Sequence, residues 1–248
     1  MAVVLEGGCR VSTMHEGAPR ISGSLKVWNQ IGRASGAEAI SLRVLEFGPG
    51  RSPGWRNREC DEVIYVLEGD CTVFIDDVAY EVGPETGIYL RPGQTLRVKR
   101  SGPDAVRFVS SQCPEETFEI VSDSVSAAVA HQPPSIVKLS DRRALPTADR
   151  WYRVLVDDDI GSEQVTQFVG SIPPGRAPDH FHEYEEVLFI LRGEGRMWAG
   201  DTNTPIGPGS CIYLPKRQVH CVENTGDGEL RLLGVFYPAG SPAVRYEA

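Results

Sequence analysis

The sequence repeats itself after half its length, and this repeat constrains the fold more than any other feature. When the 248-residue chain is shifted by 124 residues, its halves align without a gap over a long stretch. The aligned identities include Glu62 with Glu186, Gly69 with Gly193, and Ile88-Tyr89-Leu90 with Ile212-Tyr213-Leu214. One extra residue near position 52 restores the alignment farther upstream. The sequence therefore predicts two copies of one domain in a single chain.

Each copy consists of short strand-like runs separated by turn residues. The runs 63–67 and 187–191 are rich in β-branched and aromatic residues and end before a glycine. No segment of ten or more residues shows a clear helical period. Many short strands at regular spacing are typical of an all-β sandwich or barrel.

The repeat also predicts how the chain is divided. We expect an N-terminal arm at residues 1–24, a first barrel at 25–126, a linker at 127–150 and a second barrel at 151–248. The linker is placed where Pro133-Pro134 and neighbouring residues interrupt the strand pattern. The arm could pair with the opposite barrel or with another subunit, and the sequence leaves both open.

Composition excludes several classes of partner. A net charge of −9 without a Lys/Arg cluster argues against nucleic-acid or anionic-membrane binding. No apolar run approaches the roughly 20 residues that span a bilayer, and the first residues lack the basic start of a secretory signal. The six cysteines include no CxxC pair, so we expect reduced thiols and a cytoplasmic location.

The residues that can carry chemistry gather in the second copy. Three of the five histidines are His180, His182 and His220, and Glu186 lies between them. Side chains two residues apart share one face of a strand, so the first two histidines and Glu186 can point the same way. Three neutral imidazoles and a carboxylate suit Zn, Fe, Mn, Ni or Cu. A hydrogen-bonded polar cluster without metal is the alternative.

Two segments around these residues resemble the signature motifs of the cupin superfamily, namely His180-x-His182-x3-Glu186-x6-Gly193 and Gly209-x5-Pro215-x4-His220-x3-Asn224. Arg217 departs from the glycine usual in the second motif, at a position that carries no ligand. Together with the repeat, the whole chain resembles a bicupin, which has two tandem jelly-roll β-barrels. The resemblance implies that His180, His182, Glu186 and His220 hold one divalent transition metal, with Fe, Mn, Ni and Zn as candidates.

The first copy departs from this pattern. The alignment places Arg56, Arg58 and Leu96 at the positions of the three histidines, and only Glu62 is retained. Neither arginine nor leucine can offer a lone pair to a metal, so we predict one metal per chain. Because Arg56, Arg58 and Glu62 share parity, we expect them inside the first barrel. They would form either an anion-binding pocket or, as we favour, a buried Arg–Glu–Arg cluster that fills the vacated site.

The expected chemistry follows from the metal. Four protein ligands leave open coordination positions, and Glu186 is the natural general base. The resemblance to quercetinase-like cupins implies an oxidoreductase of the dioxygenase type, acting with O2 on a small enolisable or aromatic substrate. Leu188, Ile190 and Trp198 are candidates to line its pocket. The alternatives are a non-redox isomerase, decarboxylase or aminohydrolase acting on a small acid, and a non-catalytic bicupin that binds a small molecule. We also expect a homodimer, since strand edges of such barrels are commonly covered.

Overall fold

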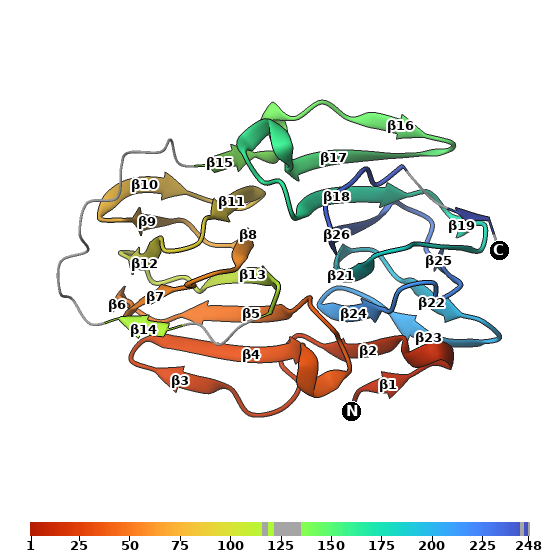
Figure 1. Cartoon of the computed structure of the whole chain (residues 1–248), viewed down its shortest axis with the longest axis horizontal. Coiled ribbons are helices and arrows are strands. Elements are labelled where there is room, and N and C mark those ends of the chain that lie inside the picture. The colour runs from red at the N-terminus through yellow and green to blue at the C-terminus, as the bar shows by residue number, and fades with distance from the viewer. Residues whose placement is uncertain (116–118, 122–134, 244–245, 248) are drawn as a thin grey trace.

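The computed structural model describes residues 1–115, 119–121, 135–243 and 246–247. These residues form two jelly-roll barrels that lie side by side (Figure 1), which confirms the predicted all-β tandem architecture. The described helical segments are short 3-10 turns: η1 (Glu6–Gly8), η2 (Arg33–Ser35), η3 (Leu139–Asp141) and η4 (Asp158–Ile160). None of the described segments is a helix long and apolar enough to cross a membrane.

The N-terminal barrel is built from a large and a small antiparallel sheet. The large sheet has seven strands in the order β15 (Ser135–Lys138), β11 (Thr86–Leu90), β8 (Asp61–Glu68), β13 (Val106–Cys113), β5 (Leu42–Phe47), β4 (Leu25–Ile31) and β3 (Arg20–Ser22). The small sheet has the order β10 (Val78–Val82), β9 (Cys71–Ile75), β12 (Thr95–Arg100), β7 (Gly54–Arg56) and β14 (Glu119–Val121), and β6 (Gly50–Arg51) also pairs with β12.

The C-terminal barrel repeats this plan. Its large sheet has eight strands in the order β1 (Val3–Val4), β2 (Arg10–Thr13), β24 (Ser210–Leu214), β21 (Glu185–Arg192), β26 (Leu230–Tyr237), β18 (Thr166–Ile172), β17 (Arg150–Val156) and β16 (Leu145–Thr147). Its small sheet has the order β23 (Thr202–Ile206), β22 (Gly195–Ala199), β25 (His220–Asn224), β20 (His180–Phe181) and β27 (Tyr246–Glu247), and β19 (Gly175–Arg176) also pairs with β25.

The two barrels exchange strands. β2 of the N-terminal arm pairs with β24 of the C-terminal barrel, and β15, which precedes the C-terminal barrel, pairs with β11 of the N-terminal one. The sequence left two possible partners for the arm, and the structure shows that the arm pairs with the opposite barrel. The sequence-based boundaries differ from this division, because β3 lies in the N-terminal large sheet and β15 lies inside the predicted linker. The exchange covers a strand edge of each large sheet.

Strand alternation divides the apolar residues among three cores. Ile64 of β8 and Leu188 of β21 point into their own barrels, whereas their neighbours Val63 and Val187 join a third core between the two large sheets. Both faces of β8 and β21 are therefore buried, which explains why these strands are continuous apolar runs. All six cysteines are described and buried, and none is paired with another.

Candidate metal centre

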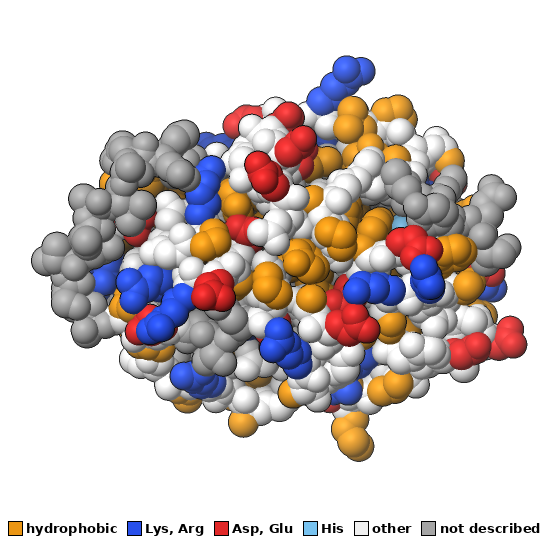
Figure 2. All heavy atoms as spheres, in the orientation of Figure 1, with side chains coloured by type: hydrophobic (Ala, Val, Ile, Leu, Met, Phe, Trp, Pro, Cys, Tyr) orange, Lys and Arg blue, Asp and Glu red, His pale blue; other side chains and the backbone are white. Residues whose placement is uncertain are grey.

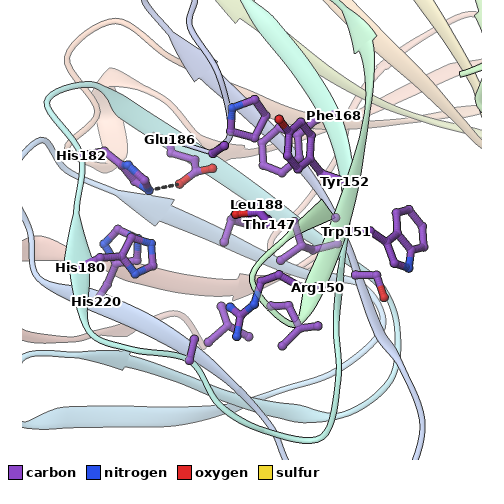
Figure 3. Close-up of a pocket in the computed structure, with 18 residues that line it drawn as sticks. Thr147, Arg150, Trp151, Tyr152, Phe168, His180, His182, Glu186, Leu188 and His220 are labelled. Carbon is purple, nitrogen blue, oxygen red and sulfur yellow. Dashed lines mark ion pairs between the residues drawn. The ribbon is translucent and has the colours of Figure 1, made fainter. Parts of the chain in front are cut away.

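Three imidazoles and one carboxylate converge inside the C-terminal barrel (Figure 3). His180 lies in β20 and faces His220, the first residue of β25, as a backbone pair. His182 follows β20, and Glu186 is the second residue of β21. The expectation of one strand through these residues is wrong, because residues 182–184 lie outside both strands, with a bend at 183 and 184 that separates β20 from β21. The bend still leaves the side chains directed at one another.

The distances suit a shared ion. One nitrogen from each of His180, His182 and His220 lies within 4.8 Å of the other two. The Oε2 atom of Glu186 lies 3.7 Å from Nε2 of His182. Two ligand atoms bound to one ion at about 2.1 Å lie at most about 4.2 Å apart. Small side-chain movements would therefore bring the four residues onto a common metal.

The surrounding backbone orients two of the imidazoles. The Nδ1 atom of His180 lies 3.0 Å from the carbonyl oxygen of Pro178, and that of His220 lies 2.7 Å from the carbonyl oxygen of Gln218. A carbonyl only accepts hydrogen bonds, so each Nδ1 carries the proton and donates it. The lone pair of each ring is then on Nε2, which is the arrangement usual for metal-binding histidines. The donor set and its orientation both fit a divalent metal.

The loop that carries Arg217 supports His182. The backbone N–H of Arg217 donates to the carbonyl oxygen of His182 at 2.7 Å. Arg217 has a φ of 61°, in the left-handed region that glycine adopts most readily. Its Nε donates to Glu183 at 2.8 Å, an ion pair that a glycine could not make. The departure from the second motif thus preserves the turn and adds a contact beside His182.

Burial changes the protonation of two members of the cluster. Burial raises the pKa of Glu186 to about 8, because the charged carboxylate loses its hydration. Burial, and secondarily the charges of His180 and His182, lowers the pKa of His220 to about 3. His220 is therefore neutral at physiological pH and free to bind a metal. Without a metal, the Glu186 carboxyl is therefore mostly protonated at neutral pH.

The cluster opens into a cavity of about 120 Å³. This is enough for several water molecules or a small organic ligand. One wall is apolar and includes Phe168, Leu188 and Leu232, while Arg150 and Tyr152 add polar groups. The sequence reasoning missed Arg150, Tyr152 and Phe168, which come from β17 and β18 rather than from the motifs. Inward parity within β17 was the signal that could have found the first two.

Comparison with known proteins agrees with this geometry. Residues 168–236 match the cupin domain. The chain is 31% identical to auxin-binding protein 1 of Arabidopsis thaliana over 86 residues, which are 31% of this chain and 43% of that protein. It is 36% identical to the oxalate-binding protein of Thermotoga maritima over 67 residues, which are 26% of this chain and 55% of that protein. The chain spans about half the length of these curated relatives.

Two solved structures share the whole architecture. Protein Ylba from E. coli superimposes with a TM-score of 0.77 over 98% of this chain and 96% of that chain, at 12% identity. A variant of Bacillus subtilis oxalate decarboxylase superimposes with a TM-score of 0.75 over 93% of this chain and 78% of that chain, at 14% identity. That decarboxylase is described with Mn(II) centres. The chain therefore has the two-barrel bicupin fold, and its C-terminal barrel contains the match to the cupin domain.

Of the three apolar residues predicted to line the pocket of the bicupin, the structure places Leu188 in the lining. Ile190 lies deeper in the core of the same barrel and is not part of the wall. The prediction that Trp198 lines the pocket is wrong, because β22 turns its side chain to the outside of the barrel. There its Nε1 donates to Glu223 at 2.8 Å and the guanidinium of Arg176 lies 4.1 Å from its ring centre.

The first barrel of the bicupin also differs from expectation. Arg56 and Arg58 do not surround Glu62. Their side chains are 36% and 73% exposed, and both pair with Glu119 at 2.9 and 3.3 Å. The predicted buried Arg–Glu–Arg cluster is therefore wrong, and the predicted anion pocket has no inward-facing arginine from these two positions. Only Glu62 points inward, as expected.

A different polar cluster occupies the barrel interior around Glu62. Its carboxylate accepts hydrogen bonds from Asn57 at 2.6 Å, Trp55 at 3.2 Å and Ser110, and it pairs with Arg43 at 3.4 Å. The Asn57 side chain in turn accepts a hydrogen bond from Gln112. This interior is filled by side chains that bind one another.

The wrong prediction for Arg56 and Arg58 comes from where the alignment placed the extra residue of the first copy. Trp55 pairs with Leu96, just as His180 pairs with His220, so Trp55 and Asn57 are the counterparts of His180 and His182. Four residues separate Asn57 from Glu62, whereas three separate His182 from Glu186. The insertion therefore lies between residues 57 and 62 rather than near 52. A shift of one residue moves every side chain to the other face of a strand, which turns both arginines outward.

Proposed function

We propose that the C-terminal barrel of this bicupin binds one divalent transition metal per chain through His180, His182, Glu186 and His220, and that the N-terminal barrel binds none. The observation that carries the proposal is the convergence of one nitrogen from each of His180, His182 and His220 within 4.8 Å of one another. Fe, Mn, Ni and Zn all accept this donor set. The Glu62 cluster supports the proposal that the N-terminal barrel binds no metal, since the side chains of this cluster already bind one another.

The bound metal would supply Lewis-acid polarisation of substrate oxygens and, for Fe, Mn or Ni, a redox centre. The chain itself supplies the rest. Glu186 would take a proton from the substrate, since it is the carboxylate that lines the cavity. Phe168, Leu188 and Leu232 pack against the body of the substrate and exclude water. These features support an enzyme that ionises a small organic molecule.

We assign this enzyme to the dioxygenase type, with a small enolisable or aromatic substrate and O2. The apolar wall supports the assignment, since it favours a neutral gas and an apolar substrate body over water. Proton removal by Glu186 would leave the substrate electron-rich and therefore open to oxidation.

A second candidate is a non-redox enzyme or binding protein for a small acid. It is favoured by two curated relatives, which are named for binding oxalate and auxin. Both matches are local, so the names of these relatives support a class of ligand rather than an activity. The same metal and the same carboxylate would serve an isomerase, decarboxylase or aminohydrolase.

Metal content tests the metal site first, and oxygen dependence then distinguishes the two candidate functions. Protein purified without chelator is expected to contain about one transition metal per chain by elemental analysis, and His182→Ala almost none. Oxygen uptake is then measured with an oxygen electrode, and substrate consumption is measured with and without oxygen, across enolisable and aromatic compounds with each candidate metal loaded. Turnover that needs oxygen supports a dioxygenase, and turnover that survives its removal supports the second candidate. A metal content below about 0.2 per chain would contradict both.

Two further expectations belong with this proposal. We propose a cytoplasmic location, which six buried cysteines without a disulfide support. We also propose a homodimer, since β1 and β3 end their large sheets with strands that no other described strand covers. Light scattering during size-exclusion chromatography checks the second expectation, and a monomeric mass at micromolar concentration would contradict it.

A further inference from the structure

Arg150 brings a positive charge into the cavity of the metal centre. It is the first residue of β17 and has the same parity as Tyr152, so both side chains face the barrel interior. Its side chain is only 15% exposed. In Figure 3 it extends into the pocket, with Leu188 between it and Glu186. Besides Arg150 and Tyr152, the charged or titratable side chains that line this cavity are Glu186 and the three histidines.

The guanidinium is only partly engaged by the protein. Its Nε donates to Asp149 at 3.0 Å, and Asp149 is 65% exposed, so this ion pair is weak. Within the described residues, the two terminal nitrogens of Arg150 make no hydrogen bond. Arginine carries five N–H donors in a planar fork that matches a carboxylate. Most of that fork remains available on the cavity side.

The N-terminal barrel shows which side chain the fold accepts at the position that corresponds to Arg150. β17 and β4 are counterparts 125 residues apart, and Arg150 corresponds to Leu25. Leu25 is 1% exposed and belongs to the apolar core of the N-terminal barrel, whose described residues form no cluster of metal-binding side chains. The fold therefore accepts an apolar side chain here. Placing a cation at such a position costs free energy unless an anion accompanies it.

We propose that Arg150 binds the carboxylate of the substrate and restricts the metal centre to organic acids. This inference rests on the proposed function and names its substrate class. The carboxylate pairs with the terminal nitrogens of Arg150, the apolar body lies against Leu188 and Phe168, and the opposite end reaches the histidines and Glu186. A substrate with a carboxylate at one end and a reactive carbon or oxygen at the other fits all three parts of the cavity.

Matched pairs of acids and amides test the inference by binding alone. Calorimetric titrations use butyrate, hexanoate, benzoate and their primary amides, with both the metal-loaded protein and the chelator-treated protein. We expect at least one acid to bind the unmodified protein more tightly than its amide. Arg150→Leu, which installs the side chain of the N-terminal barrel, should weaken acid binding about 10- to 100-fold and leave amide binding unchanged, since it removes charged hydrogen bonds. Arg150→Lys should retain part of the preference.

The control is Arg196→Leu, which removes the same charge from β22 on the outside of the same barrel. It should leave the preference for acids intact. Equal binding of acids and amides, failure of every acid to bind, or an unchanged preference in Arg150→Leu would overturn the inference. If Arg150→Leu does not fold, Arg150→Gln gives the same comparison.

Failure of this inference can be told apart from failure of the proposed function. Metal content and turnover of the unmodified protein judge the function, whereas the preference for acids in chelator-treated protein judges Arg150. Arg150→Leu should also keep about one metal per chain, because Arg150 is not among the four ligands. Loss of metal from that variant would show that the arginine supports the metal centre and not the substrate.

Discussion

The buried pair of Arg43 and Glu62 allows a quantitative prediction about the barrel that we propose binds no metal. Their side chains are 5% and 1% exposed, and the pair lies inside the N-terminal barrel. Arg43→Leu would leave the carboxylate of Glu62 buried without a cation. Breaking a buried ion pair from one side costs about 3–5 kcal/mol. Three neutral donors still reach Glu62, from Trp55, Asn57 and Ser110, so we expect the lower end, about 3 kcal/mol.

Chemical denaturation measures the loss, and thermal unfolding checks it. A chain of this length loses about 2–4 °C of melting temperature per kcal/mol, so the midpoint should fall by about 6–12 °C. Arg107→Leu is the matched control, because Arg107 lies in the same large sheet and also faces carboxylates, those of Glu46 and Glu68, but near the surface. That variant should lose less than about 1 kcal/mol. Metal content should stay at one per chain in both variants.

A double variant tests whether the unpaired charge of Glu62 causes the loss of stability. Combining Arg43→Leu with Glu62→Gln removes the unpaired charge and keeps an acceptor for Trp55 and Asn57, so most of the stability should return. If Arg43→Leu behaves like Arg107→Leu, or if the double variant is less stable than Arg43→Leu alone, the ion pair does not stabilise this barrel.

Three other predictions concern the C-terminal barrel. His182→Ala should lower metal content from about one per chain to near zero, as measured by elemental analysis, and unchanged content would contradict its role as a ligand. In metal-free protein, Glu186 stays protonated when folded up to its pKa of about 8 but ionises at about 4.5 when unfolded, so it lowers stability as pH rises between these values. Glu186→Gln should therefore gain about 3 kcal/mol over the unmodified protein between pH 5 and pH 7, at about 1.4 kcal/mol per pH unit, whereas a constant difference in urea unfolding would refute this. Gly234→Ala should cost about 1–3 kcal/mol, because the new methyl group would lie 2.3 Å from the Phe168 ring, and Phe168→Leu in the same chain should relieve that cost.

The repeat and the alternation of the strands predicted much of the fold. Val187–Leu191 and its counterpart Val63–Leu67 are continuous apolar runs, and the structure buries both faces of each. The exchange of β2 and β15 could not be predicted, because both are short strands whose partners lie in the opposite barrel. Local sequence gives propensity to form a strand, but the choice of partner depends on tertiary contacts.

The candidate ligands were accessible from the sequence because their side-chain chemistry and spacing are specific. The walls of the cavity were not, since Phe168 and Leu188 are apolar residues in strands where most apolar residues only pack the core. Trp198 shows that the sequence can also suggest a wall residue that lies outside the cavity. An aromatic residue near a motif suggests a pocket, yet its position in β22 turns it toward Arg176 and Glu223.

The two barrels hold a buried carboxylate at the same position in two different ways, and this difference explains why one of them should bind a metal. Glu62 is surrounded by Arg43 and by neutral donors, which compensate its charge and fill the space. Glu186 has Phe168 in the place of Arg43 and faces three imidazoles across a cavity. Burial disfavours its ionised form, as its raised pKa shows. A divalent cation held by the imidazoles would reverse that balance, because it supplies the positive charge that Arg43 supplies in the other barrel.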